Sequence, residues 1–152
     1  MSNTQAMCTS FMEQLLTGTH NFTTGTGDTF KAALYLASAT VNAATTAYSS
    51  TDEVTGTNYT AGGVTVTNGT SPASTNSSAT AGVAYWTPSA SITYTNVTLT
   101  TAFDAVLIYN SSKSDKAVSV HTFGSQTVTA GTFTLTMPTN NTTNALLRLA
   151  TT

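Results

Sequence analysis

The sequence predicts an all-β fold, a β-sandwich or jelly roll with one short N-terminal helix. Charged residues make up only 7% of the 152 residues, against about 25% in an average domain, and threonine takes much of their place. Threonine is β-branched and stiff at χ1, so it favours strands, and its hydroxyl keeps an exposed sheet face hydrated. Short apolar or alternating runs also recur about every 8–12 residues between turn-rich segments, as in sandwiches.

The strongest element is Ala102–Phe123. Ala105–Tyr109 is the most apolar run of the chain, Asn110–Lys116 is a polar turn, and Ala117–Phe123 alternates between two faces. This pattern predicts a β-hairpin with one strand in the centre of a sheet.

Ser10–Gly18 is the one segment that predicts a helix. Ser10 and Glu13 have the spacing of a capping box, and Gly18 suits the C-terminal end. The predicted apolar stripe consists of Phe11, Met12, Leu15 and Leu16. A helix this short is unstable alone. We therefore expect it to pack either on its own domain or on a neighbouring subunit. We therefore assign residues 1–27 to an N-terminal segment, part of the domain or an assembly arm, and 28–152 to the sandwich.

The middle of the chain predicts few regular elements. Alternation favours a strand over Thr29–Ala37, followed by a long excursion over Ser38–Gly63 and a short strand at Val64–Thr67. Asn68–Gly82 is rich in Ser, Thr and Ala, which predicts a surface loop.

The C-terminal half predicts a series of short, separate strands. Pro88 requires a turn or a sheet edge, and Ala130-Gly131 predicts a turn between antiparallel strands. The predicted strands are Val83–Thr87, Ser91–Thr95, Asn96–Thr100, Gln126–Thr129, Thr132–Met137 and Asn144–Ala150.

The pattern of reactive side chains predicts no enzyme, no cofactor and no metal site. His20 and His121 are the only histidines, and neither has a nucleophile elbow near it in the sequence. Cys8 is the only cysteine, which excludes an internal disulfide and a cysteine-based zinc site. A Ca²⁺ ion near Asp52, Glu53 or Asp115 remains an alternative.

Charge also limits the partners. The formal net charge is −2 with only four Lys and Arg, so no basic patch is available to replace the counterions of nucleic acid or of an anionic membrane. We expect neither partner.

Aromatic residues offer one alternative function. Trp86 and Tyr85, with Tyr48, Tyr59 and Tyr94, could line a sugar-binding groove. Aromatic side chains in a sandwich are more often core or interface anchors.

Low charge indicates an assembly component, because little repulsion keeps copies apart and no charged residues protect the strand edges. We expect a homo-oligomer, with a trimer favoured. The predicted contacts lie in the N-terminal segment and the excursion, at Met7, Phe11, Met12, Asp52, Glu53 and Tyr59.

Four stretches carry a resemblance to a known class. DTFKAALYLASAT (28–40), AYSSTDEVTGTNYTAGGVTVT (47–67), AYWTPSASITYTNVTLTTAFDAVLIYN (84–110) and FGSQTVTAGTFTLTMPT (123–139) resemble small virion structural proteins of tailed bacteriophages. The resemblance implies a virion component made in the bacterial host cytoplasm, and we favour a capsid decoration (cement) protein that binds the major capsid protein. A tail, neck or fibre component, or a carbohydrate-binding attachment module, are the alternatives.

Overall fold

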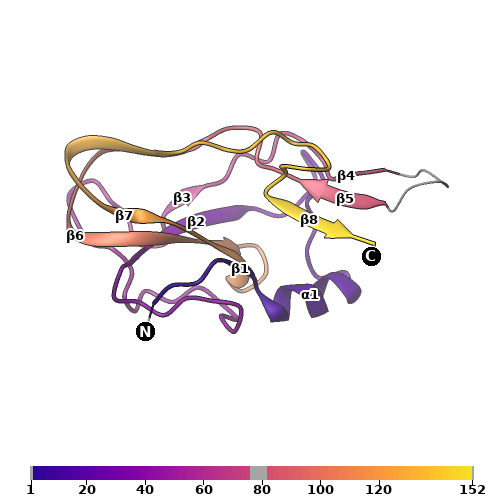
Figure 1. Ribbon diagram of the computed structural model, residues 1–152, viewed down its shortest axis with the longest axis horizontal. Helices are drawn as coiled ribbons and strands as arrows, with labels where there is room; N and C mark the ends of the chain where they lie inside the picture. The colour runs from indigo at the N-terminus through magenta and orange to yellow at the C-terminus, as the bar shows by residue number, and fades with distance from the viewer. Residues whose placement is uncertain (1, 76–81, 152) are drawn as a thin grey trace.

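The computed structural model describes residues 2–75 and 82–151, and places them in two antiparallel sheets with one short helix (Figure 1). The sheet orders are β1-β7-β6-β2-β3 and β4-β5-β8. The all-β prediction with a short N-terminal helix is confirmed, whereas this strand order does not establish a jelly roll. The elements are β1 (Ala6–Met7), α1 (Thr9–Leu16), β2 (Phe30–Leu36), β3 (Val64–Thr65), β4 (Ala73–Ser74), β5 (Val83–Trp86), β6 (Ile92–Asn110), β7 (Lys116–Leu135) and β8 (Leu147–Ala150).

The hairpin of β6 and β7 is the largest element, and it confirms the predicted hairpin around the polar turn. The predicted short strands Val83–Thr87 and Asn144–Ala150 are confirmed as β5 and β8. The prediction that the other four are separate strands is wrong, because a strand of 19 residues pairs with one of 20. Within β6 the predicted strands Ser91–Thr95, Asn96–Thr100 and Ala105–Tyr109 are continuous, and within β7 so are Ala117–Phe123, Gln126–Thr129 and Thr132–Met137 as far as Leu135.

The breaks that suggest separate strands are irregularities in one ladder. The register between β6 and β7 shifts at five places. Asn96 and Ala130 have left-handed backbones, with φ of 52° and 45°. The predicted turn at Ala130-Gly131 is therefore wrong, since the chain passes through this point without reversing. Such a register shift, a β-bulge, leaves an extra residue in one strand without a partner in the other, which bends the strand and increases its twist.

The hairpin bends so far that its two halves pack against each other. Phe103 is opposite Gln126 in the ladder, and Tyr94 is opposite Phe133. Phe133 lies seven residues beyond Gln126, about 23 Å of extended strand. Yet the ring centroids of Phe103 and Phe133 are 5.0 Å apart, edge to face. In Figure 1 the hairpin curves round at one end of the molecule and returns over the large sheet.

An aromatic cluster fills the inside of this bend. The ring of Phe123 lies 6.0 Å from that of Phe103 and 5.3 Å from that of Phe133. The Tyr94 ring is 6.2 Å from that of Phe133, and its hydroxyl donates to the Ala32 carbonyl at 2.7 Å. This contact ties the returning half of the hairpin to β2.

β2 confirms the strand predicted at Thr29–Ala37, but both of its faces are buried. Residues 32–35 are at most 2% exposed, although the alternating pattern predicts one buried and one exposed face. The excursion Ser38–Gly63 covers part of this strand: the Val54 amide donates to the Leu34 carbonyl at 3.0 Å, and the Leu36 amide donates to the Asp52 carbonyl at 3.0 Å.

A buried carboxylate organises the excursion. Glu53 is 5% exposed and accepts hydrogen bonds from the Tyr48 hydroxyl at 2.6 Å, the Tyr59 hydroxyl at 2.7 Å and the Gly62 amide at 2.8 Å. Burial, and next the hydrogen bond to Glu53, raise the pKa of both tyrosines, so their hydroxyls remain donors. The Tyr109 hydroxyl of β6 donates to the Gly62 carbonyl at 2.8 Å, which anchors the end of the excursion.

The helix α1 begins earlier than predicted. The Cys8 amide bonds to the Val118 carbonyl at 3.0 Å, so the edge pairing of β1 continues up to the first helical residue, Thr9. The predicted capping box at Ser10 and Glu13 is wrong, because Ser10 lies inside the helix and its buried hydroxyl has no hydrogen-bond partner.

The C-terminal end of α1 confirms the role of Gly18. Its φ is +67°, its amide donates to the Leu15 carbonyl at 3.2 Å, and the Thr19 amide donates to the Gln14 carbonyl at 2.9 Å. These two bonds form a Schellman motif, which needs a left-handed residue. Of the two modes of docking left open, the structure shows the helix on its own domain, with Phe11 2% exposed.

Part of the predicted loop Asn68–Gly82 forms a strand. β4 pairs with β5 at Ala73↔Tyr85 and Ser74↔Ala84. Residues 76–81 of the predicted loop lie outside the described residues.

We predict that Phe103→Ala lowers the free energy of unfolding by about 3–5 kcal/mol, because it removes a fully buried ring from inside the bend. Urea denaturation measures this loss. Thr127→Ala, at an exposed position of the same hairpin, is the control and should change stability by less than about 0.5 kcal/mol. Equal effects of the two substitutions would contradict the role of the cluster.

We expect Glu53→Gln to lower the free energy of unfolding by about 1–3 kcal/mol, because it weakens three charge-assisted hydrogen bonds in a buried site. The matched control is Asp52→Asn, which removes the same charge from the exposed neighbour and keeps a side chain that tolerates its left-handed backbone. Equal urea midpoints for both variants would show that Glu53 does not organise the excursion.

Candidate functional site

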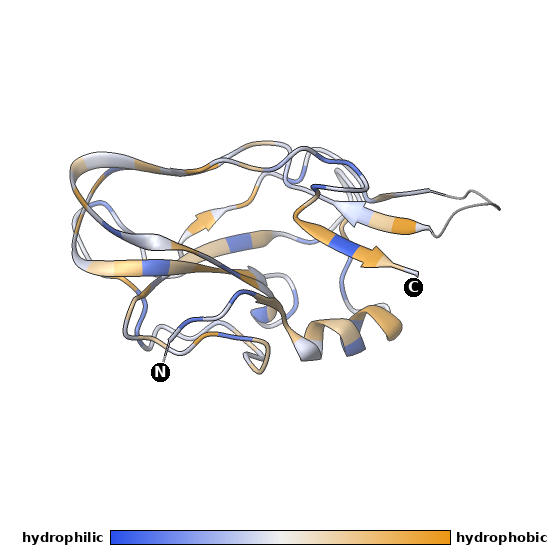
Figure 2. Ribbon diagram, in the orientation of Figure 1, coloured by the Kyte–Doolittle hydropathy of each residue, from blue (hydrophilic) through white to orange (hydrophobic). Residues whose placement is uncertain are grey.

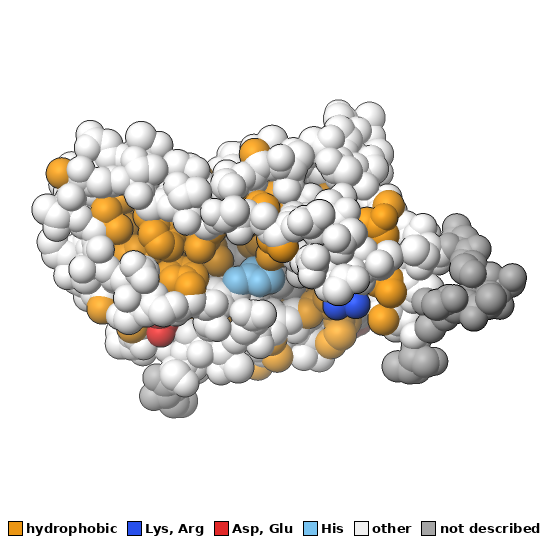
Figure 3. Space-filling model, turned by 45° about the horizontal axis from the view of Figure 1, so that its top comes forward, with side chains coloured by type: hydrophobic (Ala, Val, Ile, Leu, Met, Phe, Trp, Pro, Cys, Tyr) orange, Lys and Arg blue, Asp and Glu red, His pale blue; other side chains and the backbone are white. Residues whose placement is uncertain are grey.

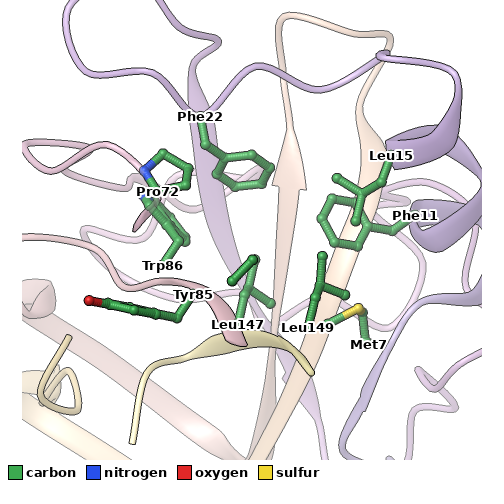
Figure 4. A pocket seen from close by; sticks show the side chains of 10 residues that line it. Met7, Phe11, Leu15, Phe22, Pro72, Tyr85, Trp86, Leu147 and Leu149 are labelled. Carbon is green, nitrogen blue, oxygen red and sulfur yellow. The ribbon is translucent and has the colours of Figure 1, made fainter. Parts of the chain in front are cut away.

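The candidate site is an apolar groove of about 100 Å³ between α1 and the three-stranded sheet (Figure 4). Figure 4 shows Phe11 and Leu15 of the helix on one side, and Leu147 and Leu149 of β8 facing them. The lining residues are Met7, Phe11, Leu15, Phe22, Pro72, Ala84, Tyr85, Trp86, Leu147 and Leu149.

Local structure explains why these side chains meet. Phe11 and Leu15 are four residues apart on α1 and so share one face. On β8, Leu147 and Leu149 share a face because side chains alternate along a strand. Figure 2 shows hydrophobic residues along β8 and α1 at this end of the molecule. The groove therefore joins two apolar faces that do not close completely on each other.

The base of the groove is a rigid aromatic stack. Phe22 stacks on Phe30 with ring centroids 4.2 Å apart, and Trp86 meets Phe22 edge to face at 4.8 Å. The Trp86 indole N–H donates to Asn68 Oδ1 at 3.1 Å and to the Thr70 carbonyl at 3.0 Å. These bonds fix the position of the ring beneath the groove.

A second hollow adjoins the groove and shares Met7 and Leu147 with it. It has a volume of about 360 Å³ and lies between β1 and β7 on one side and residues 145–148 on the other. A third, of about 130 Å³, shares His121 and Leu146 with the second. Figure 3 shows a histidine in such a hollow, with hydrophobic side chains beside it.

His121 belongs to a structural pair. Its Nε2 lies 2.9 Å from Ser119 Oγ, and burial lowers its pKa to about 4, so the imidazole is neutral at pH 7. Ser119 is only 1% exposed, and no carboxylate lines the second or the third hollow. The pair lacks the orienting acid and the accessible hydroxyl that a nucleophilic serine requires.

His20, which follows the C-terminal end of α1, has different hydrogen-bond partners. Its Nε2 lies 2.7 Å from Gln14 Oε1, and its Nδ1 lies 2.9 Å from Asn110 Nδ2. Asn110 also donates to Asp28 Oδ2 at 2.8 Å. Burial lowers the pKa of His20, while Asp28 opposes this effect. This network connects the helix to the end of β6.

The predicted contact residues separate into two groups. Met7 and Phe11 line the groove, and Met12 lies on the same helix with 45% of its side chain exposed. Asp52, Glu53 and Tyr59 do not line it. Phe11 and Glu53 are buried within the chain's own fold, so neither offers more than a small surface to a partner.

The sequence reasoning did not identify β8 as part of the site. Leu149 is 45% exposed and Arg148 is exposed. The alternation of Leu147, Arg148 and Leu149 is the available signal, and by itself it predicts only a final strand.

The aromatic residues proposed for sugar binding are largely internal. Trp86 is 3% exposed and Tyr94 is 2% exposed, and both polar groups bond within the chain. Tyr48 stacks on Tyr109 with centroids 4.7 Å apart. The structure thus uses Tyr48, Trp86 and Tyr94 for packing, whereas Tyr85 is half-buried and lines the groove.

Within residues 2–75 and 82–151, no cluster of three or more His, Cys, Asp or Glu side chains is suited to hold a metal ion. Burial raises the pKa of the Cys8 thiol to about 11, so it is protonated at neutral pH. In the same part of the chain, no helix has the length and apolar character needed to span a membrane.

No family model matches this chain, and neither the curated proteins nor the solved structures contain a significant match.

We predict that the protein loses stability as the pH falls from about 6.5 to 4. The pKa of His121 is lowered to about 4 in the fold, so below pH 6.5 the unfolded chain binds the proton first. The full effect of this group is about 3 kcal/mol. Urea midpoints at pH 7 and pH 4 measure it, and His121→Gln should show a smaller difference between the two. An unchanged difference in the variant would contradict the assignment.

Proposed function

We propose that this chain is a non-enzymatic structural protein of a tailed-bacteriophage virion, and that it acts as a capsid decoration protein. The resemblance of the sequence to small virion proteins supports the class. The observation that carries the proposal is the apolar groove, which lies beside exposed Leu149 and next to a helix with exposed Leu16. An uncharged apolar surface of this kind is stabilised when another protein covers it.

The physical mechanism is mutual burial. Leu16 is 90% exposed, and Met12 and Leu149 are each 45% exposed. Covering a large aliphatic side chain contributes about 1.5–3 kcal/mol. If the decoration protein covers apolar surface at a junction between major capsid subunits, it binds the assembled shell in preference to free subunits, and mass action then stabilises the shell.

The alternative is a tail, neck or fibre component, which would use the same contact surface at a different place in the particle. Copy number separates the two roles, because a decoration protein is present in hundreds of copies and a neck or tail ring in about six or twelve. The carbohydrate-binding alternative is less favoured, because Trp86 and Tyr94 lie in the core.

The test is the thermal stability of particles that lack this chain. We expect addition of the purified protein to raise the temperature at which the shell opens, and Leu149→Asp to abolish the rise because it places a charge in the apolar groove. The control is Thr127→Asp, which places the same charge at an exposed position of the hairpin. Failure of the wild-type protein to bind shells would contradict the proposal, and binding confined to tails would favour the alternative.

A further inference from the structure

Two exposed charges of opposite sign, Arg148 on β8 and Glu13 on α1, lie close to the apolar groove or the second hollow. Among the described residues, the one ion pair joins Lys113 and Asp28 at 3.7 Å. Arg148 therefore has no ion-pair partner within residues 2–75 and 82–151, and it is the only charged residue there that lines either the groove or the second hollow. A partner for this surface should combine apolar side chains with one carboxylate.

The outward face of α1 has this composition. Phe11 and Leu15 face the domain, so helical geometry turns Met12, Glu13 and Leu16 away from it. All three are exposed, and Leu16 is the most exposed large hydrophobic residue described. Glu13 and Leu16 are three residues apart and so are neighbours on the helix surface.

We propose that the groove and the second hollow receive the outward face of α1 from a second copy of this chain. Leu16 of one copy enters the groove of the other, and Glu13 approaches Arg148. The inference rests on the proposed function only in that a decoration protein assembles from several copies. It deepens that function by naming the two surfaces that join them.

Charge complementarity favours a second copy as the occupant. The receiving surface contains one cation and no carboxylate, whereas the outward face of α1 contains one carboxylate and no cation. Every copy has both surfaces, so the contact gives a symmetric dimer when it is reciprocal, and a ring when a head-to-tail series of contacts closes. The net charge of −2 adds little repulsion between copies.

Sedimentation equilibrium of the full chain tests this inference by charge reversal. We expect Glu13→Arg and Arg148→Glu each to weaken self-association by about tenfold or more, because each places like charges together. The double variant restores the opposite charges and should recover most of the wild-type affinity. Thr127→Arg, on the exposed hairpin bend, is the control and should associate like the wild type.

Leu16→Ser provides a second readout, because a side chain that is 90% exposed contributes little to the fold of one copy. It should raise the dissociation constant, while circular dichroism and the melting temperature remain those of the wild type. A monomeric wild-type chain at high micromolar concentration, or a double variant no tighter than the singles, would overturn the proposed contact. Shell binding by the wild-type chain tests the proposed function separately: a chain that self-associates through this contact but binds no shell contradicts the decoration role and leaves the contact between copies intact.

Discussion

The fold depends on the bend of the β6–β7 hairpin. Phe103, Phe123 and Phe133 meet inside it, although two of them are far apart along the ladder. This contact brings the returning half of the hairpin over β2, where Tyr94 bonds to the Ala32 carbonyl. The bend therefore sets the position of the segment that leads from β7 to β8. The groove in turn depends on how β8 is held opposite α1.

A second constraint is the scarcity of charge. The only buried carboxylate described is Glu53, and it is surrounded by donors from within the excursion. Elsewhere the chain closes its loops with hydroxyls and amides, as at Asn3, which bonds to both Asp104 and the Leu36 carbonyl. Such a chain satisfies most of its polar groups internally, and at the α1–β8 end it leaves exposed apolar side chains with one carboxylate, Glu13, and one cation, Arg148.

Sequence reasoning predicted the all-β class, the central hairpin, β2 and the Gly18 end of the helix, because these follow from local periodicity and backbone preference. It missed the continuity of β6 and β7, because a bulge at Asn96 or Ala130 has the same local pattern as a turn. It predicted a helix cap at Ser10, but edge pairing at Cys8 moved the start of the helix. The groove was beyond local reasoning, since α1 and β8 meet only through the tertiary fold.

Electron cryo-microscopy of the particle that contains this chain tests the central claim most directly, namely that the α1–β8 end is its contact surface. We expect many copies on the icosahedral shell, with Leu16, Leu149 and Arg148 covered by neighbouring subunits. Copies whose α1–β8 end faces solvent, while the hairpin bend or the Glu53 excursion makes the contacts, would contradict it.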